Sequence, residues 1–176
     1  MSRYRRLWHP GGTYFFTHTV LWRSTDLLIR HVDILRSAVI GVRAAHPFVI
    51  LAWVVLPYHF HCVMRLPEGD SRFDLRWRLI KQHFSKRIPP LEPLSEARRS
   101  RGERGLWQRR YWEHLIRDER DLEAHIDYVH INPVKHGFAP TVTSWPHSTF
   151  HRLVRAGVYP PDWAGSSAAD QLSYRN

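Results

Sequence analysis

The stretch that decides the fold is Phe48 to Leu66, which reads FVILAWVVLPYHFHCVMRL. Its first part, 48–56, is continuously apolar, which is typical of a buried strand. A Pro-Tyr pair then breaks the chain, and 59–66 alternates in the manner of a second strand. Because so short a connection returns the chain alongside itself, the two strands are predicted to pair antiparallel.

Outward from this hairpin, strands alternate with helices. Aromatic and β-branched residues predict a strand over 13–21, and apolar residues at helical spacing predict a helix over 26–45, with Asp26 as its cap. The order continues with a basic amphipathic helix at 73–87, a last strand at 106–117 and a helix from Asp118 to about Asn132, which Pro133 should stop before the terminator Gly137. This order favours an α+β fold of the ferredoxin-like type, an antiparallel sheet with helices on one face. The proline-rich remainder is expected to be irregular and to pack or bind.

A length of 176 residues predicts one domain. We expect that domain to cover 1–165, with a flexible tail at 166–176. Residues 88–105 interrupt the periodic pattern with prolines, glycines and an arginine-rich run, which indicates a mobile basic loop rather than a boundary.

The charge balance indicates a polyanionic partner. There are 26 Lys and Arg against 16 Asp and Glu, a net charge of +10. Nucleic acid is the first candidate, although an arginine surplus can equally reflect a GC-rich genome. A membrane is the weaker alternative, because no stretch approaches the ~20 apolar residues of a spanning helix and the start of the chain lacks the apolar core of a secretion signal. Cys62 is alone, which excludes an intrachain disulfide and suits a reducing cytoplasm.

His59 and His61 are the first candidates for chemistry. Residues two apart in a strand share a face, so both imidazoles would converge on one point, as a metal site requires. With 13 histidines in the chain, one such pair is also expected by chance. A catalytic metal usually takes three protein ligands, so a third must come from elsewhere.

Tyr128 and Asn132 are the second candidates, since residues four apart are neighbours on a helix face. At 100° per residue they lie roughly 120° and 80° from the centre of the apolar stripe, on the shoulder of the buried face. Tyr128 could reach a cleft from there, or it could border the core with its hydroxyl in water.

These residue types suit one reaction. A tyrosine hydroxyl, with a pKa near 10, attacks a phosphodiester only if a cation stabilises the developing charge. Two imidazoles and an amide oxygen would leave that cation its full charge and open positions. Such a mixed site suits Mg²⁺ or Mn²⁺, and Mn²⁺ matches imidazole better.

Several motifs resemble those of the REP-associated tyrosine transposases, relatives of the single-tyrosine transposases of small bacterial insertion elements. The resemblance covers roughly residues 4–165. It rests on Tyr4-Arg5-Arg6, on VLPYHFHC at 55–62, WRLIK at 77–81, WQRRYWEH at 107–114, DYVHINPVKHG at 127–137 and WPHSTFHR at 145–152.

The resemblance implies a ferredoxin-like HUH fold in which His59 and His61 bind the metal and Tyr128 becomes linked to a DNA 5′-phosphate. Insertion-element relatives carry Gln four residues after the tyrosine, where this chain has Asn132, so Asn132 is the expected third ligand and His125 its rival. The implied substrate is single-stranded DNA folded into REP-type palindromic hairpins. The implied protein is a nucleoid-associated cytoplasmic DNA endonuclease and strand transferase, with a monomer favoured.

Basic side chains supply candidate DNA contacts, each of which could equally be a solvated surface charge. The candidates are Arg5, Arg6, Arg76, Arg78, Lys81, Lys86, Arg109 and Arg110. Tyr111 lacks an acceptor four residues on, so packing or base stacking suits it better than nucleophilic attack.

Two other functions remain open. One is a catalytically silent protein that binds DNA hairpins. The other is a metal-dependent hydrolase, which is disfavoured because Cys62 to Arg65 supply none of the further Asp and His ligands that two-metal hydrolases place after such a pair.

Overall fold

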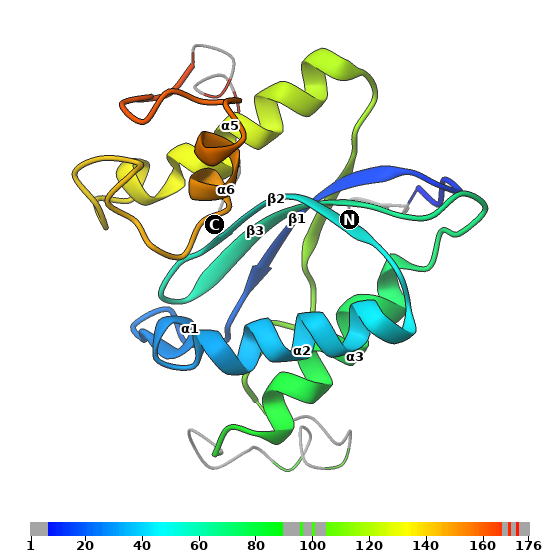
Figure 1. Cartoon of the computed structure of the whole chain (residues 1–176). Coiled ribbons are helices and arrows are strands. Elements are labelled where there is room, and N and C mark those ends of the chain that lie inside the picture. Colours follow the sequence, from blue (N-terminus) through cyan, green and yellow to red (C-terminus); the bar gives the residue numbers. More distant parts are fainter. Residues whose placement is uncertain are drawn as a thin grey trace, which may run out of the picture.

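A computed structural model describes residues 7–89, 96, 100, 105–166, 169 and 172. It contains a four-stranded sheet of order β2-β3-β1-β4 with helices on both sides (Figure 1). Its strands are β1 (Thr13–Thr19), β2 (Val49–Val55), β3 (His59–Arg65) and β4 (Trp112–Leu115). All neighbouring strands pair antiparallel, which confirms the predicted hairpin and the α+β, ferredoxin-like class.

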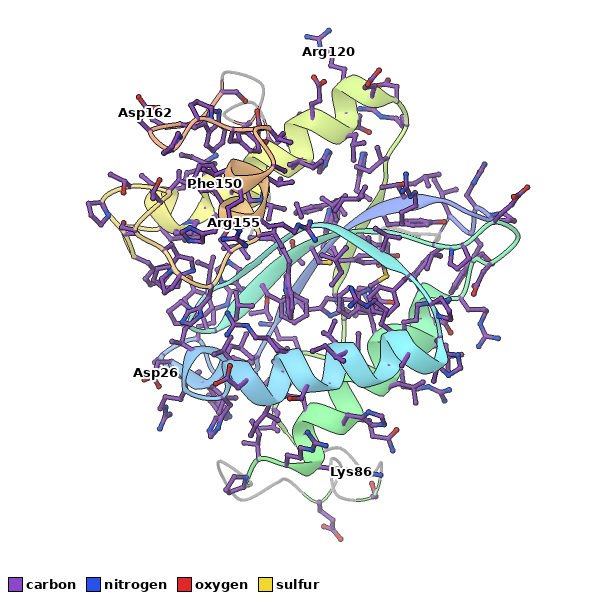
Figure 2. All side chains as sticks on the ribbon, in the orientation of Figure 1. Asp26, Lys86, Arg120, Phe150, Arg155 and Asp162 are labelled. Atoms are coloured by element: carbon purple, nitrogen blue, oxygen red, sulfur yellow. The ribbon has the colours of Figure 1, made fainter. Side chains whose placement is uncertain are left out.

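The alternation of β1 and β3 divides the interior into two cores. Phe16, Phe60 and Met64 face one side, where they pack against α1 (Leu27–Arg30), α2 (Val32–Ala45) and α3 (Phe73–Lys86). Phe15 and Val63 face the other side, which is covered by α5 (Glu119–Lys135) and α6 (Phe150–Arg155). Side chains fill both layers (Figure 2). The expectation of helices on one face is therefore wrong. Helices α5 and α6 bury their apolar residues against the face of the sheet opposite to α2 and α3.

Helix α5 begins and ends in ways that the sequence predicts only in part. Asp118 caps it, since its carboxylate accepts a hydrogen bond of 2.8 Å from the Asp121 amide. The predicted stop before Pro133 is wrong, because the helix runs on to Lys135. A bond of 3.0 Å from the His136 amide to the Asn132 carbonyl spans the proline and preserves the last turn. Gly137, at φ 70°, then ends the helix as predicted.

Other boundaries also differ from prediction. The 26–45 helix is split into α1 and α2, and the Asp26 side chain, rather than capping, forms an exposed ion pair of 2.6 Å with Arg30. The 106–117 strand is reduced to β4 because only its last part reaches β1. The expected basic loop at 88–105 and the tail at 166–176 lie largely outside the described residues. Within the described part of the chain, no helix is long and apolar enough to cross a membrane.

The segment after α5 covers the open edge of the sheet beside β2. The Thr149 amide donates to the Trp53 carbonyl at 2.8 Å, and the Val55 amide donates to the His147 carbonyl at 2.9 Å. The Trp145 indole adds a bond of 2.9 Å to the Val55 carbonyl. This irregular segment therefore protects an edge that would otherwise present unpaired backbone groups.

Candidate active site

Strand β3 places His59 and His61 on the α5 side of the sheet, while Phe60 between them enters the opposite core. Both histidines are fully buried, and their ring centroids are 4.9 Å apart. The shared face that the sequence predicts is thus present. A pair of imidazoles in this setting is either packed as neutral rings or held ready to ligate a metal.

His61 is oriented by β1. Its Nδ1 lies 2.8 Å from the Thr17 hydroxyl, and its ring stacks on Phe15 at 5.5 Å. If Nδ1 carries the proton and donates to Thr17, the lone pair of Nε2 is left for a metal, as is usual for histidine ligands. Nε2 has no hydrogen bond of ordinary geometry among the described residues.

Neither ring nitrogen of His59 has a hydrogen-bond partner among the described residues, although the side chain is buried. Its ring contacts Tyr58 at 4.7 Å and His136 at 5.0 Å. Buried polar nitrogens normally have a partner, and a cation bound by His59 is one partner that would satisfy them.

Burial keeps both imidazoles neutral. Desolvation, followed by His136 and Arg23, lowers the pKa of His59 to about 3. Desolvation likewise lowers the pKa of His61 well below its usual value, with His59 and His136 acting in the same direction. The Asn132 side chain is close enough to His61 to oppose this by hydrogen bonding, although that contact falls short of ordinary hydrogen-bond geometry. Neutral imidazole is the form that binds a metal.

Tyr128 of α5 lies directly against this pair. Its ring is 5.4 Å from that of His61 and 5.8 Å from that of Phe15, both edge-on. The side chain is 3% exposed. The helical spacing predicted a position on the shoulder of the buried face, but α5 has buried residues on more than one side, and Tyr128 is among them.

Asn132 completes what we call the His59 cluster: His59, His61 and Asn132. The side chain is buried, and its amide nitrogen donates to the Tyr128 carbonyl one turn earlier. The amide oxygen is therefore the atom that remains for a ligand role. Two neutral ring nitrogens and one amide oxygen fit a divalent cation that binds mixed nitrogen and oxygen ligands.

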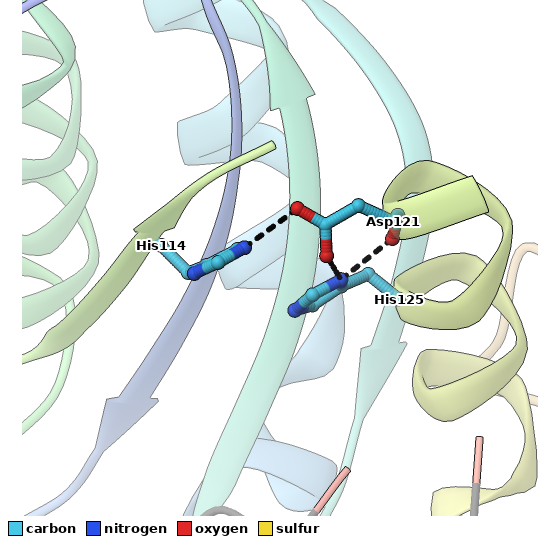
Figure 3. A group of neighbouring side chains, drawn as sticks. All are labelled: His114, Asp121 and His125. Atoms are coloured by element: carbon cyan, nitrogen blue, oxygen red, sulfur yellow. Dashed lines mark hydrogen bonds and ion pairs between the residues drawn. The ribbon is translucent and has the colours of Figure 1, made fainter. Parts of the chain in front are cut away.

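His125, the rival third ligand, belongs to a different group, which we call the Asp121 cluster: His114, Asp121 and His125 (Figure 3). Their possible ligand atoms all lie within 4.8 Å of one another, so by residue type and spacing these three could also hold a metal. His114 Nε2 is 2.9 Å from Asp121 Oδ2, and His125 Nδ1 is 3.1 Å from Oδ1 and 2.7 Å from the Asp121 carbonyl.

Arg117 closes the Asp121 cluster, since its amide and its Nε both donate to Asp121 Oδ2, at 3.0 and 3.1 Å. Burial raises the pKa of Asp121, but the hydrogen bonds from Arg117 and His114 outweigh it and hold the pKa well below its usual range. The two imidazoles stack at 4.6 Å with nearly parallel planes. In this arrangement one ring nitrogen of each histidine, His114 Nε2 and His125 Nδ1, is occupied by a hydrogen bond to Asp121.

Two further residues face the candidate site and carried no assignment from the sequence. His136 contacts His59, and the Lys135 ammonium lies 5.1 Å from the centre of the Tyr128 ring. The signal was available, because residues seven and eight positions after Tyr128 return to its side of the helix. It was hidden by the expectation that Pro133 ends the helix.

The basic candidates divide by exposure. Arg78, Lys86, Arg109 and Arg110 are exposed, whereas Lys81 is half-buried with its ammonium over the rings of Trp107 and Tyr111. Arg76 must be corrected: it is 2% exposed, and its guanidinium binds Asp70 at 2.7 Å and the Pro47 carbonyl. The side chain is thus used inside the protein. Arg5 and Arg6 lie outside the described residues.

Tyr111, the other candidate tyrosine, lies on the opposite side of the sheet from Tyr128. Its ring stacks on His18 at 4.4 Å and approaches Phe16 at 6.1 Å, both within the core under α3. This placement supports packing rather than nucleophilic attack.

Comparison with known proteins gives close relatives over nearly the whole chain. A REP-associated tyrosine transposase of Escherichia coli K12 is 48% identical over 165 residues, covering 94% of this chain and 92% of its own. A relative from Haemophilus influenzae is 42% identical over 167 residues, covering 94% of this chain and 95% of its own. A solved REP-associated tyrosine transposase bound to a REP hairpin superposes with a TM-score of 0.82 at 46% identity, covering 99% of this chain and all of its own. No family model matches.

Proposed function

This chain belongs to the REP-associated tyrosine transposases, and from that premise we propose that it cuts and rejoins single-stranded DNA at REP-type hairpins through a covalent tyrosine intermediate. The observation that carries the proposal is the contact between the Tyr128 ring and His61 at 5.4 Å. Helix α5 supplies the phenol nucleophile and strand β3 supplies a pair of neutral imidazoles that can bind a metal, and this chemistry needs both.

In this proposal the Tyr128 hydroxyl oxygen attacks the scissile phosphorus. A Tyr128 oxygen–phosphorus bond forms to the 5′-phosphate, the bond from phosphorus to the 3′-oxygen breaks, and the phenol proton is balanced by the proton that the 3′-hydroxyl gains. Phosphodiester energy is conserved in the adduct, so a second 3′-hydroxyl can reverse the step and join a new strand.

His59, His61 and Asn132 would hold Mg²⁺ or Mn²⁺. When bound, such an ion supplies charge to polarise the phosphate. The support is their geometry: unpartnered nitrogens on His59 and His61 and an amide oxygen beside them, all buried. Thr17 would fix the orientation of His61, as outer hydrogen bonds commonly do for histidine ligands.

Exposed basic side chains on α3 and before β4 would contact the DNA backbone. Arg78, Lys86, Arg109 and Arg110 are the members of the candidate set with exposed side chains, and Arg5 and Arg6 remain candidates from the sequence. Such contacts neutralise phosphates and position the hairpin without reading its sequence. The structure of the relative bound to a REP hairpin supports this choice of partner.

The test is adduct formation. Purified protein is incubated with end-labelled single-stranded DNA that carries a palindromic hairpin, with Mn²⁺ present, and resolved on a denaturing gel beside Tyr128→Phe. We expect label to migrate with the wild-type protein and not with the variant. Tyr111→Phe is the matched control and should retain the adduct.

Two outcomes would contradict the proposal. An adduct that persists in Tyr128→Phe would show that another residue is the nucleophile. Hairpin binding with neither cleavage nor adduct under Mg²⁺ or Mn²⁺ would favour the catalytically silent hairpin-binding protein instead. Turnover of DNA without any protein-linked product would point to a hydrolase.

A further inference from the structure

Lys135 places a positive charge against the proposed nucleophile. Its ammonium lies 5.1 Å from the centroid of the Tyr128 ring. The contact joins residues seven apart on α5, with Asn132 on the same stripe of the helix between them. The side chain therefore extends along the face of the helix that carries the candidate site.

The ordinary role of a lysine in the last turn of a helix is to neutralise the carbonyl end of the helix dipole. The contacts of Lys135 do not fit that role. The last carbonyls are satisfied by the backbone, with the Phe138 amide on the Pro133 carbonyl at 2.8 Å and the Gly137 amide on that of Val134 at 3.0 Å. Among the described residues no carboxylate pairs with Lys135, so its charge is not neutralised locally.

The position of Lys135 is also fixed. The last turn of α5 is held by Gly137, at φ 70°, and by the hydrogen bonds from the Gly137 and Phe138 amides to carbonyls of that turn. His136, the next residue, packs on His59 at 5.0 Å, so the same turn is held against β3. Lys135 itself is exposed, whereas Tyr128, His59 and His61 are buried, which places the ammonium at the solvent side of the site.

We propose that Lys135 is a further catalytic residue, which binds a non-bridging oxygen of the scissile phosphate and stabilises the charge that develops as Tyr128 attacks. This inference rests on the proposed function. A lysine suits the task because it remains a compact charge with three donors on a flexible stem. No atom is transferred to or from Lys135: the bond from Tyr128 to phosphorus forms and the bond to the 3′-oxygen breaks as before.

The test compares rates with binding. Single-turnover adduct formation and hairpin affinity are measured for Lys135→Met, Lys135→Arg and Arg120→Met. Arg120 is the matched control, because it loses one positive charge from the exposed far end of the same helix (Figure 2). We expect Lys135→Met to slow adduct formation by about 10²-fold, the typical effect of removing one oxyanion donor, with hairpin affinity within about 3-fold of wild type, since one phosphate contact adds little to the total. Lys135→Arg should recover most of the rate, and Arg120→Met should match the wild type.

A second substrate separates a phosphate contact from a structural effect. If the scissile phosphate is replaced by an uncharged methylphosphonate, the difference between wild type and Lys135→Met should shrink markedly, because the charge that Lys135 binds has been removed. A difference that persists in full would mean that Lys135 only holds the Tyr128 ring, and would overturn the proposal. An unchanged rate in Lys135→Met would overturn it too. If the wild type forms no adduct at all, the proposed function fails and this inference fails with it.

Discussion

Two histidine-rich clusters lie against α5, and they use their imidazoles in opposite ways. In the Asp121 cluster, each histidine directs a nitrogen at one carboxylate, which also accepts two hydrogen bonds from Arg117. In the His59 cluster, three of the four ring nitrogens lack a hydrogen bond of ordinary geometry among the described residues, and no carboxylate is bound to them. The difference teaches that residue type and spacing alone do not identify a metal site. A metal site also needs available lone pairs, and on that criterion the His59 cluster is the stronger candidate.

The largest effect is expected when the histidines of the His59 cluster are replaced. His59→Ala with His61→Ala should abolish tight Mn²⁺ binding and slow adduct formation by about 10³-fold, because the proposed ligands are removed. His114→Ala with His125→Ala, the matched control, should keep Mn²⁺ affinity within about 10-fold if the cluster acts only from outside the metal site. Isothermal titration with Mn²⁺ on metal-free protein measures both. Loss of binding in the second pair alone would reverse the assignment.

Asp121→Asn should show what the other cluster is for. The Asp121 side chain is 6% exposed, and its carboxylate contacts His114 of β4, Arg117 of the following loop and His125 of α5. An amide in its place would leave at least one of these donors unmatched, at a cost of about 2–4 kcal/mol in the free energy of unfolding. Urea unfolding measures the change. Asp162→Asn, at an exposed surface position, should stay within about 0.5 kcal/mol, and an equal loss in both variants would argue against a structural role.

Acid should separate the two clusters by pH. His59 has a folded pKa of about 3, below its usual value near 6.5, so as pH falls below 6.5 the unfolded chain takes up a proton that the folded protein does not. Stability should then fall by up to about 1.4 kcal/mol per pH unit for this group. Asp121 has a lowered folded pKa, so its contribution is complete above about pH 4 and is lost as pH falls further.

Urea unfolding of metal-free protein between pH 7 and pH 3 resolves these two limbs. His59→Phe should make the limb between pH 6.5 and pH 4 shallower by up to about 1.4 kcal/mol per pH unit, because other buried histidines still contribute to it, and should leave the lower limb unchanged. Asp121→Asn should do the reverse. An upper limb that keeps its full slope in His59→Phe would contradict the contribution assigned to His59.

The smallest effect is expected for Arg117, and it tests whether the arginine charge is needed to hold the Asp121 cluster together. The Arg117 side chain is 72% exposed, so its ion pair with Asp121 is screened by water. Arg117→Gln should cost about 0.5 kcal/mol or less, because the backbone amide still binds the carboxylate. Thermal unfolding in low and high salt measures it. A loss comparable with that of Asp121→Asn would mean that the arginine charge, rather than the hydrogen-bond network, maintains the cluster.

Much of the fold was predictable because its local signals are strong. The apolar run of β2, the alternation of β3 and the cap at Asp118 all hold in the structure. The sequence could not assign α5 to a face of the sheet, since an amphipathic helix fits either side. Pro133 was misjudged because the cost of a proline is offset where the surrounding turn is tied down by other bonds.

The candidate site was predictable as a set of residues but not as an arrangement. His-x-His spacing in a strand puts His59 and His61 on one face, and the structure agrees. That His125 belongs to a separate cluster follows from β4 and Asp121, which no periodicity in α5 reveals. Arg76 looked like a surface charge, yet Asp70 and the Pro47 carbonyl lie within its reach only once α3 has packed.

The two-sided use of β3 has a consequence for how such a protein can vary. His59, His61 and Val63 serve the α5 side, while Phe60, Cys62 and Met64 serve the other core. A single inserted or deleted residue in this strand would exchange the two sets. It would place the imidazoles in the hydrophobic core under α2 and α3, and phenylalanine against Tyr128. Substitutions can therefore explore β3 one position at a time, but length changes cannot. Strand β2, which already carries an irregular register between Ile50 and Ala52, is where the sheet can absorb them.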